Sequence, residues 1–183
     1  MDIKSSVFIA TSLDGYIARP DGRIDWLEQA NERVPEDEDF GYGDFIASVD
    51  VLVMGRNSFE KVLSFEDWPY GLKPVVVLSR SSISIPPALS QTVSVSSEAP
   101  QDLVARLAET GAKHLYIDGG LVIQSFLQEG LIDDLIITVI PILLGTGKPL
   151  FGTLPQDVPL LHLATKAYEF GFVQNQYRVS KNI

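Results

Sequence analysis

Apolar and polar residues alternate in blocks along this chain, and the length and spacing of each block indicate the element that it forms. Short apolar runs rich in β-branched residues are typical of strands buried on both faces. Such runs occur at Val7 to Thr11, Val51 to Met54, Val75 to Leu78 and Leu115 to Ile117, and a longer run covers Leu135 to Leu144. The pattern therefore predicts five buried strands.

Segments with apolar residues at helical spacing lie between these runs. They cover Phe40 to Val49, Ser58 to Leu63, Pro100 to Thr110 and Gly120 to Glu129. The third has a proline near its start and Gly111 directly after its end, an arrangement that helices prefer. Because strands and helices alternate, we expect a largely parallel sheet with helices on both faces.

The last part of the chain follows a different pattern. Leu160 to Ala167 and Phe172 to Val179 contain strand-forming residues, and Phe170-Gly171 between them predicts a turn. We therefore expect an antiparallel hairpin at one edge of the sheet. The stretch Ser79 to Pro100 is rich in serine and proline, which predicts a loop with one short strand at Thr92 to Val95. The chain length of 183 residues predicts one α/β domain, residues 1–183.

Composition excludes several functional classes. A net charge of −10 argues against nucleic-acid binding, which needs basic patches. No apolar run is long enough for a membrane helix, and the N-terminus lacks the apolar stretch of a secretory signal. Without cysteine there are no disulfides, and the two histidines show no spacing typical of metal ligands. We therefore expect a cytoplasmic protein that binds neither metal, membrane nor nucleic acid.

Polar and glycine-rich segments follow four of the predicted strands. In open α/β sheets, ligands bind outside the carboxyl ends of the strands, so these segments are the candidate site. They are Ser12-Leu13-Asp14-Gly15, Gly55-Arg56-Asn57-Ser58, Ser79-Arg80-Ser81 and Asp118-Gly119-Gly120.

The chemistry of these segments suits a phosphorylated dinucleotide. Arg56 and Arg80 each place a guanidinium group at a strand end, and Gly119-Gly120 lets a pyrophosphate approach a helix start. Two arginines favour NADP over NAD, because NADP carries an extra phosphate. The alternative is that these residues only shape turns and that the arginines are solvated surface charges. Asp118 would repel a phosphate, so we expect its side chain to cap a backbone N–H.

The ordered motifs resemble the RibD C-terminal domain family, which shares the dihydrofolate reductase fold. They are SLDGYIARPDG (12–22), VLVMGRNSFEKV (51–62), PVVVLSRS (74–81), LYIDGGLVIQSFL (115–127) and VIPILLGTGKPLF (139–151), and they span nearly the whole chain. The first and last are more similar to the riboflavin-type reductases than to true dihydrofolate reductase.

The resemblance implies that NADPH binds across the carboxyl edge of the sheet. Arg56, Asn57 and Ser58 would meet the adenosine-side phosphates, and Leu78, Ser79 and Arg80 would flank the adenine ribose and its 2′-phosphate. Gly119, Gly120, Leu121 and Val122 would cradle the pyrophosphate, whereas Ala10, Thr11 and the loop Leu13 to Ile17 would border the nicotinamide. Gly55 and Asp118 belong to the same expected cofactor site.

The resemblance also implies a reaction. The riboflavin-type enzymes reduce a ribosylamino-pyrimidine phosphate, 5-amino-6-(5-phosphoribosylamino)uracil. The family resemblance also implies that this chain forms a homodimer. Many such reductases follow a deaminase domain, which this chain lacks. Three alternatives therefore stay open: a dihydrofolate reductase-like enzyme, a nucleotide-binding protein without turnover, and a small-molecule binding protein that takes no cofactor.

A reductase also needs a proton donor, and the resemblance to dihydrofolate reductase implies one acid ahead of the second strand. Counting back from Met54 gives Asp39, with Asp37, Glu38 and Asp44 as rivals. The alternative is that this acidic run is a solvated helix start, where carboxylates favour the helix dipole.

Further substrate contacts are expected from other parts of the sequence. Phe40 and Tyr42 could stack on a flat heterocycle, although core packing is the commoner fate of phenylalanine. Asp25 and Trp26 lie in a predicted loop across the site. Gly145-Thr146-Gly147-Lys148 is either a tight turn or a segment that brings Lys148 to a substrate phosphate. The apolar strand Leu135 to Leu144 is a candidate dimer contact.

Overall fold

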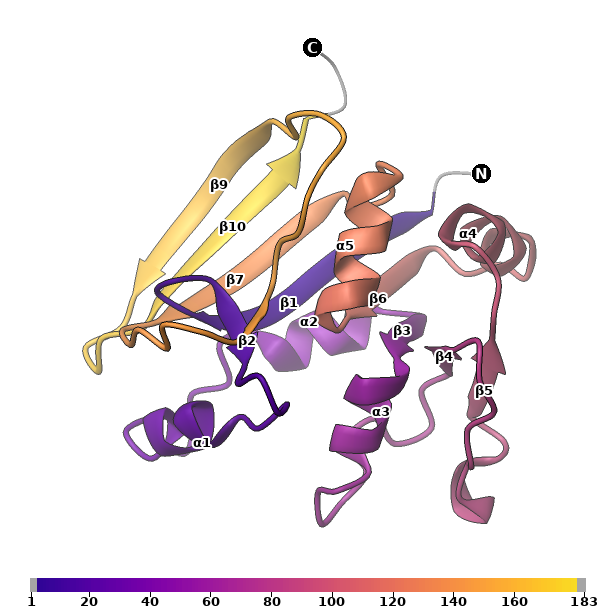
Figure 1. The fold of residues 1–183 in the computed structure, drawn as a ribbon, viewed down its shortest axis with the longest axis horizontal. Helices are drawn as coiled ribbons and strands as arrows, with labels where there is room; N and C mark the ends of the chain where they lie inside the picture. Colours follow the sequence, from indigo (N-terminus) through magenta and orange to yellow (C-terminus); the bar gives the residue numbers. More distant parts are fainter. Residues whose placement is uncertain (1–2, 181–183) are drawn as a thin grey trace.

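The computed structural model describes residues 3–180, and eight of its strands form one twisted sheet (Figure 1). The strand order is β5-β4-β3-β6-β1-β7-β10-β9. The bounds are Lys4–Ser12 for β1, Val51–Gly55 for β3, Val75–Leu78 for β4, Val93–Ser96 for β5, His114–Asp118 for β6, Asp134–Ile140 for β7, Leu160–Ala167 for β9 and Val173–Val179 for β10. The first six strands in this order, β5-β4-β3-β6-β1-β7, pair in parallel. Strand β10 pairs antiparallel with β7 and with β9. The expected parallel sheet and its C-terminal antiparallel hairpin are confirmed.

Within residues 3–180, five α-helices connect these strands. They are α1 (Asp25–Asn31), α2 (Tyr42–Ser48), α3 (Arg56–Val62), α4 (Pro100–Glu109) and α5 (Gly120–Gln128), with a 3₁₀ turn, η1, at Pro87–Leu89. A second, two-stranded sheet pairs β2 (Tyr16–Ala18) with β8 (Lys148–Pro149). None of the helices within residues 3–180 is long and apolar enough to cross a membrane.

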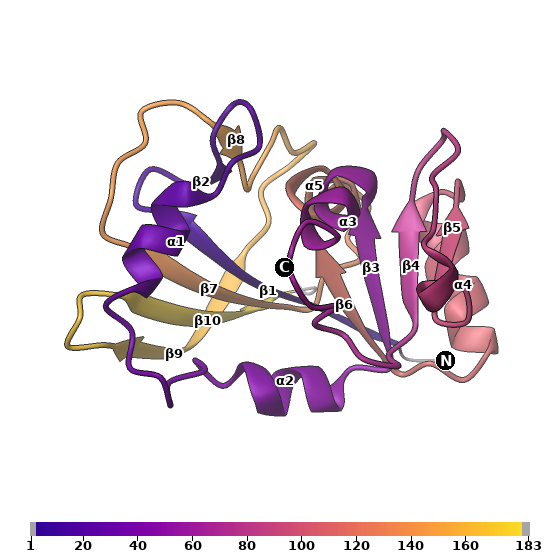
Figure 2. The same ribbon diagram turned by 90° about the horizontal axis from the view of Figure 1, so that it is seen from below.

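Helices cover both faces of the sheet, as the alternating pattern predicts. Figure 2 shows α2 on one face and α5 on the other. Leu103 of α4 and Phe126 of α5 are fully buried in one core cluster, whereas Phe45 of α2 and Phe59 of α3 belong to the opposite cluster. Replacing a fully buried phenylalanine by alanine typically costs about 3–5 kcal/mol, so both clusters hold the strand ends firmly in place.

Several predicted boundaries are wrong, each for a local reason. Helix α2 begins at Tyr42 rather than at residue 40, because Phe40 (φ 61°) and Gly41 (φ 79°) are left-handed. Strand β7 ends at Ile140, directly before Pro141, instead of continuing to residue 144. Helix α3 begins at Arg56, two residues earlier than expected.

One further expectation fails on topology. Asp25 and Trp26 begin helix α1 rather than lying in a loop. Strand β7 is paired on both sides, with β1 and with β10, and most of its residues are buried; its part in a dimer contact stays a prediction. The free edge at that side of the sheet belongs to β9, whose residues are all exposed.

Candidate active site

The carboxyl ends of the parallel strands bring three of the candidate segments together. In the ladder between β3 and β4, Gly55 pairs with Leu78, and in the ladder between β3 and β6, Met54 pairs with Asp118. The residues that follow these strands therefore lie along one rim of the sheet. The end of β1 lies on the same side, next to β7, where Ser12 pairs with Ile140.

The paired glycines occupy the most crowded place on this rim. Gly119 has a φ of 89°, and a Cβ atom there would collide with the Ser58 side chain of α3. A Cβ atom on Gly120 would lie 2.9 Å from Ile17 Cδ1 and 3.1 Å from the carbonyl oxygen of Pro149. Glycine is therefore required at both positions, by conformation at the first and by space at the second.

The two arginine-bearing segments meet across neighbouring strand ends. Arg56 Nη1 donates to Ser81 Oγ at 3.4 Å, and Arg56 Nε donates to Glu60 at 2.6 Å. Arg80, next to Ser81, is exposed, as are Arg56 and Asn57. Ser79 closes a small turn by accepting from the Ser81 N–H at 3.2 Å. This arrangement places the Arg56 guanidinium against the Ser81 hydroxyl, with the exposed Arg80 directly before Ser81 in the chain, and these groups suit a phosphate.

The loop after β1 is held by a carboxylate that sequence reasoning left without a role. Asp14 accepts hydrogen bonds from Ser12 Oγ at 2.6 Å, Leu144 N at 3.1 Å and Gly145 N at 2.7 Å. The Ser12 hydroxyl, followed by the two amides, lowers the Asp14 pKa. Asp14 thus fixes the segment after β7 against the loop that would border the nicotinamide, which supports the tight-turn interpretation of residues 145–148.

The remaining expected cofactor residues differ in exposure. Thr11 is buried, Ala10 and Leu78 are half-buried, and Ile17 packs over Gly120. Leu13 is 65% exposed and Leu121 is 76% exposed, so both apolar side chains are free to contact a ligand. Val122 is buried and lies 3.2 Å from a Cβ atom built on Gly55, so it packs the start of α5 against β3.

Asp118 is the most unusual titratable group on the rim. Its side chain is half-buried, and this burial raises the pKa of the carboxyl group to about 6, while the Gly119 amide opposes the shift. The expected hydrogen bond to a backbone N–H is therefore present. It is too weak to offset desolvation, which disfavours the charged form.

Tyrosines surround this carboxyl group. Burial, and then the charge of Asp118, raises the pKa of Tyr42 to about 12 and raises the pKa values of Tyr70 and Tyr116. The Tyr42 ring lies 5.3 Å from Phe8 and 6.4 Å from Tyr116, between centroids. Sequence reasoning missed Tyr70 and its neighbour Trp68, because the loop that carries them shows no periodic pattern.

Asp39 has a different environment. It is exposed, and its two carboxylate oxygens accept from Gly43 N at 2.9 Å and Gly41 N at 2.8 Å. These hydrogen bonds, with that from Gly43 the larger, lower the Asp39 pKa. Glu38 likewise accepts from Phe40 N at 2.7 Å and binds Lys166 at 3.2 Å. The geometry favours the alternative interpretation, in which the acidic run forms a helix start.

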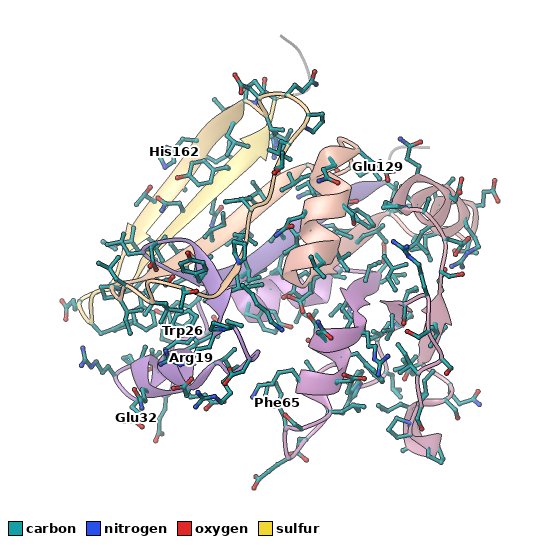
Figure 3. The ribbon with its side chains drawn as sticks, in the orientation of Figure 1. Arg19, Trp26, Glu32, Phe65, Glu129 and His162 are labelled. Atoms are coloured by element: carbon teal, nitrogen blue, oxygen red, sulfur yellow. The ribbon has the colours of Figure 1, made fainter. Side chains whose placement is uncertain are left out.

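The other candidates for substrate contact are used within the protein. Asp25 binds Arg19 at 2.7 Å, and Trp26, only 1% exposed, lies between α1 and the sheet (Figure 3). The Phe40 ring packs in the same aromatic cluster, 5.1 Å from Tyr168 and 5.9 Å from Phe172. Trp26 and Phe40 therefore belong to a hydrophobic core cluster. Within residues 3–180 no cluster of three or more metal-binding side chains occurs.

Comparison with known proteins gives a consistent family. The RibD C-terminal domain matches residues 5–171. The uncharacterized protein YwjB of Bacillus subtilis (strain 168) is 36% identical over 170 residues, which is 92% of this chain and 94% of YwjB. A crystal structure from Shewanella sp. PV-4, named for riboflavin biosynthesis, is 42% identical with a TM-score of 0.91, covering 98% of this chain and all of that chain.

More distant structures share the fold. Dihydrofolate reductase from Enterococcus faecalis, solved with NADP(H), has a TM-score of 0.63 at 17% identity, and the alignment covers 97% of both chains. The Thermotoga maritima deaminase/5-amino-6-(5-phosphoribosylamino)uracil reductase has a TM-score of 0.72 at 16% identity, over 98% of this chain and 57% of that one. The chain therefore belongs to the RibD C-terminal domain family and has a dihydrofolate reductase-like fold.

Proposed function

We propose that this protein is an NADPH-dependent reductase of a small heterocyclic substrate. The observation that carries the proposal is Asp118, a half-buried carboxyl group whose pKa is raised to about 6. It lies directly before the paired glycines that would receive the cofactor. A perturbed carboxyl at the ligand-binding edge of an α/β sheet is typical of a catalytic site.

The residues of the rim fit a phosphorylated dinucleotide. Gly119 and Gly120 would leave the backbone open to the diphosphate, and Arg56 and Arg80 would bind the 2′-phosphate together with Ser81. Leu13 and Leu121 supply exposed apolar contacts. NADPH, when bound, supplies a hydride for reduction of a carbon–nitrogen or carbon–oxygen double bond, and becomes NADP⁺.

The protein itself would contribute a residue that donates a proton to the substrate. Reduction adds the hydride to carbon and one proton to nitrogen or oxygen, so a donor must be protonated near neutral pH. Asp118 comes nearer to this condition than an ordinary carboxyl group, because burial raises its pKa to about 6. Asp39 remains the alternative donor, but two backbone amides stabilise its charged form, so it is less often protonated near neutral pH than Asp118.

Cofactor binding is the first test. Fluorescence titration should show tight binding of NADPH with clear preference over NADH. Oxidation of NADPH is then followed with dihydrofolate and with amino-substituted pyrimidines as substrates. Binding without any turnover would leave a nucleotide-binding protein, and failure to bind NADPH would contradict the proposal.

Two matched variants identify the proton donor. Asp118→Asn should slow turnover by about 100-fold or more, since general acid catalysis typically contributes about 10²–10⁴-fold. Its NADPH affinity should stay within about twofold of wild type. Asp39→Asn, which removes the same charge, should change turnover little. The reverse result would assign the proton to Asp39.

We also propose that two copies associate through strand β9. This edge strand exposes Leu160, Leu161 and Leu163, with Leu161 at 58%. Residues 158–180, which include β9 and β10, contain one of the 24 acidic residues, Glu169, so these two strands carry little negative charge. An exposed antiparallel edge strand can pair with the same strand of a second copy across a twofold axis.

Leu161→Asp should give a monomer in light scattering, whereas the control Leu72→Asp, at an 89% exposed loop residue, should not.

A further inference from the structure

A cavity of about 410 Å³ lies at the end of the sheet opposite to the candidate active site. It is lined by the last turn of α4 and by the amino ends of β3, β4 and β5. Val51 begins β3 at this cavity, and Gly55 ends the same strand at the cofactor rim. Because a strand rises about 3.3 Å per residue, these two residues are about 13 Å apart. None of the residues that line the cavity belongs to the expected cofactor or substrate site.

The cavity combines buried apolar side chains with a few exposed polar ones. Val51, Val75, Val76 and Leu107 are buried and line it. In the ladder between β4 and β5, Val76 pairs with Ser94, an exposed residue that also lines the cavity. The Ser94 hydroxyl makes no hydrogen bond within residues 3–180. Concave sites of about 300–1,000 Å³ that are mostly apolar, with a small number of polar groups, are typical of small-molecule binding.

Asp50 supplies a charged group at the edge of the cavity. Its Oδ2 atom accepts from the backbone amides of Lys113 and His114 at 2.8 and 2.9 Å, which fixes the orientation of the carboxylate. In the part of the chain that the structure describes, Oδ1 accepts no hydrogen bond. The Lys113 amide, which has the largest influence, lowers the Asp50 pKa, so this group is charged at neutral pH.

Two basic side chains near the cavity already have partners within the protein. Arg106 binds Glu98 through Nε at 3.0 Å and through Nη2 at 2.8 Å, so its charge is compensated. Lys73, whose charge also acts on Asp50, donates to the carbonyl oxygen of Val49. The C-terminal end of α4, which borders the cavity, adds the negative end of a helix dipole. The cavity therefore favours a cation over an anion.

We propose that this cavity binds a small aliphatic amine. The ammonium group donates to Asp50 Oδ1, and the Ser94 hydroxyl accepts a second of its protons. The hydrocarbon chain packs on the buried side chains of Val51, Val76 and Leu107, which removes apolar surface from water. The site is separate from the proposed reductase site, so the amine and NADPH bind at the same time.

A matched set of ligands tests the site and its charge preference. Amide chemical shifts of the ¹⁵N-labelled protein are followed at pH 7 with n-butylamine, 1-butanol and pentanoate, which share a butyl chain and differ in charge. n-Butylamine should shift the amides of Val51, Val76 and Ala112, and should bind at least about fivefold more tightly than the other two ligands. Equal affinity for all three would overturn the assignment of an amine. No shift at these amides would overturn the site itself.

Two variants of the cavity test the residues, each with a matched control. Asp50→Asn keeps an oxygen that accepts from the two amides but removes the charge, and it should weaken n-butylamine at least about fivefold. Asp157→Asn, at an exposed residue outside the cavity, should not. Ser94→Phe should fill the cavity and abolish binding, whereas Val95→Phe places the same ring on the opposite face of β5 and should not. Unchanged binding in both cavity variants would contradict the inference.

Titration in the presence of NADPH separates this site from the reductase site. The affinity for n-butylamine should change by less than about twofold at saturating NADPH, which corresponds to almost no coupling between the two sites. Competition between the two ligands would place the amine at the cofactor rim and overturn the inference. Failure of NADPH to bind would contradict the proposed function alone, because the amine titration does not depend on the cofactor.

Discussion

Carboxylates at the two ends of the parallel sheet differ in their partners. At the amino end, Asp134 binds Lys4 at 2.6 Å and Arg178 at 3.0 Å, and Asp50 accepts from the backbone amides of Lys113 and His114 at 2.8 and 2.9 Å. At the carboxyl end, Asp118 has no cationic partner among the residues that shift its pKa. The carboxylates at the amino end are therefore paired within the protein, whereas Asp118 at the carboxyl end has no cationic partner and is available to a ligand.

The difference appears as opposite pKa shifts. Burial alone would raise the Asp134 pKa, but hydrogen bonds from Arg178 and Lys4 outweigh it, so the net pKa is lowered. The Asp118 pKa is raised, because burial is opposed by one amide. A satisfied carboxylate stabilises the fold, whereas an unsatisfied one costs stability and is found where a ligand or a reaction uses it.

The largest expected effect comes from removing the charge of Asp118. A folded-state pKa raised from 3.8 to about 6 means that wild-type stability falls as the pH rises through this interval. At about 1.4 kcal/mol per pKa unit, the loss reaches at most about 3 kcal/mol. Asp118→Asn should therefore be more stable than wild type at pH 7.5, and the advantage should shrink at pH 4. Urea unfolding at both pH values measures this, and a constant difference would contradict it.

A methyl group on the first glycine of the pair should have the next largest effect. Gly119→Ala places a Cβ atom at a φ of 89° and against the Ser58 side chain. Backbone strain of this kind costs about 1–3 kcal/mol. We expect lower unfolding free energy and at least tenfold weaker NADPH binding. Gly130→Ala is a suitable control, since its φ is also positive but a Cβ atom there meets nothing within 4 Å. It should lose stability and keep NADPH affinity.

Breaking the amino-end network should affect stability alone. Asp134→Asn removes a charge that binds two cations, and we expect a loss of about 1–2 kcal/mol at pH 7, since both partners are about half exposed. The stabilisation is present above the ordinary carboxyl pKa and is lost as the pH falls through the lowered one. Urea unfolding at pH 7 and pH 3 should show the difference shrinking in acid. A change in NADPH affinity would break the proposed division between the two ends.

The smallest effect is expected from the exposed arginines of the rim. Arg80→Ala should weaken NADPH binding about tenfold, which is about 1.4 kcal/mol, and should leave NADH binding nearly unchanged. Arg56→Ala should act in the same direction but less strongly, because Glu60 already binds this guanidinium. Parallel fluorescence titrations measure both. Equal losses for the two cofactors would show that neither arginine contacts the 2′-phosphate.

Local pattern was sufficient for most of the fold. The apolar runs predicted β1, β3, β4, β6 and the start of β7, because a buried parallel strand needs a continuous apolar segment. The errors lie where a single residue overrides the pattern. Pro141 ends β7, and the left-handed Phe40 and Gly41 delay α2. Apolar periodicity shows neither the strand end that a proline imposes nor a left-handed backbone.

The candidate site divides in the same way. The sequence by itself determined the glycine pair, the arginines and the parallel strand ends, since each depends on residue type and on chain order. Only the tertiary structure decided that Tyr42, Tyr70 and Tyr116 gather around Asp118, and that backbone amides bind Asp39. The physical reason is that a carboxyl group's pKa depends on its burial and on its neighbours in space. For Asp118, two of those neighbours, Tyr42 and Tyr70, come from parts of the chain dozens of residues away.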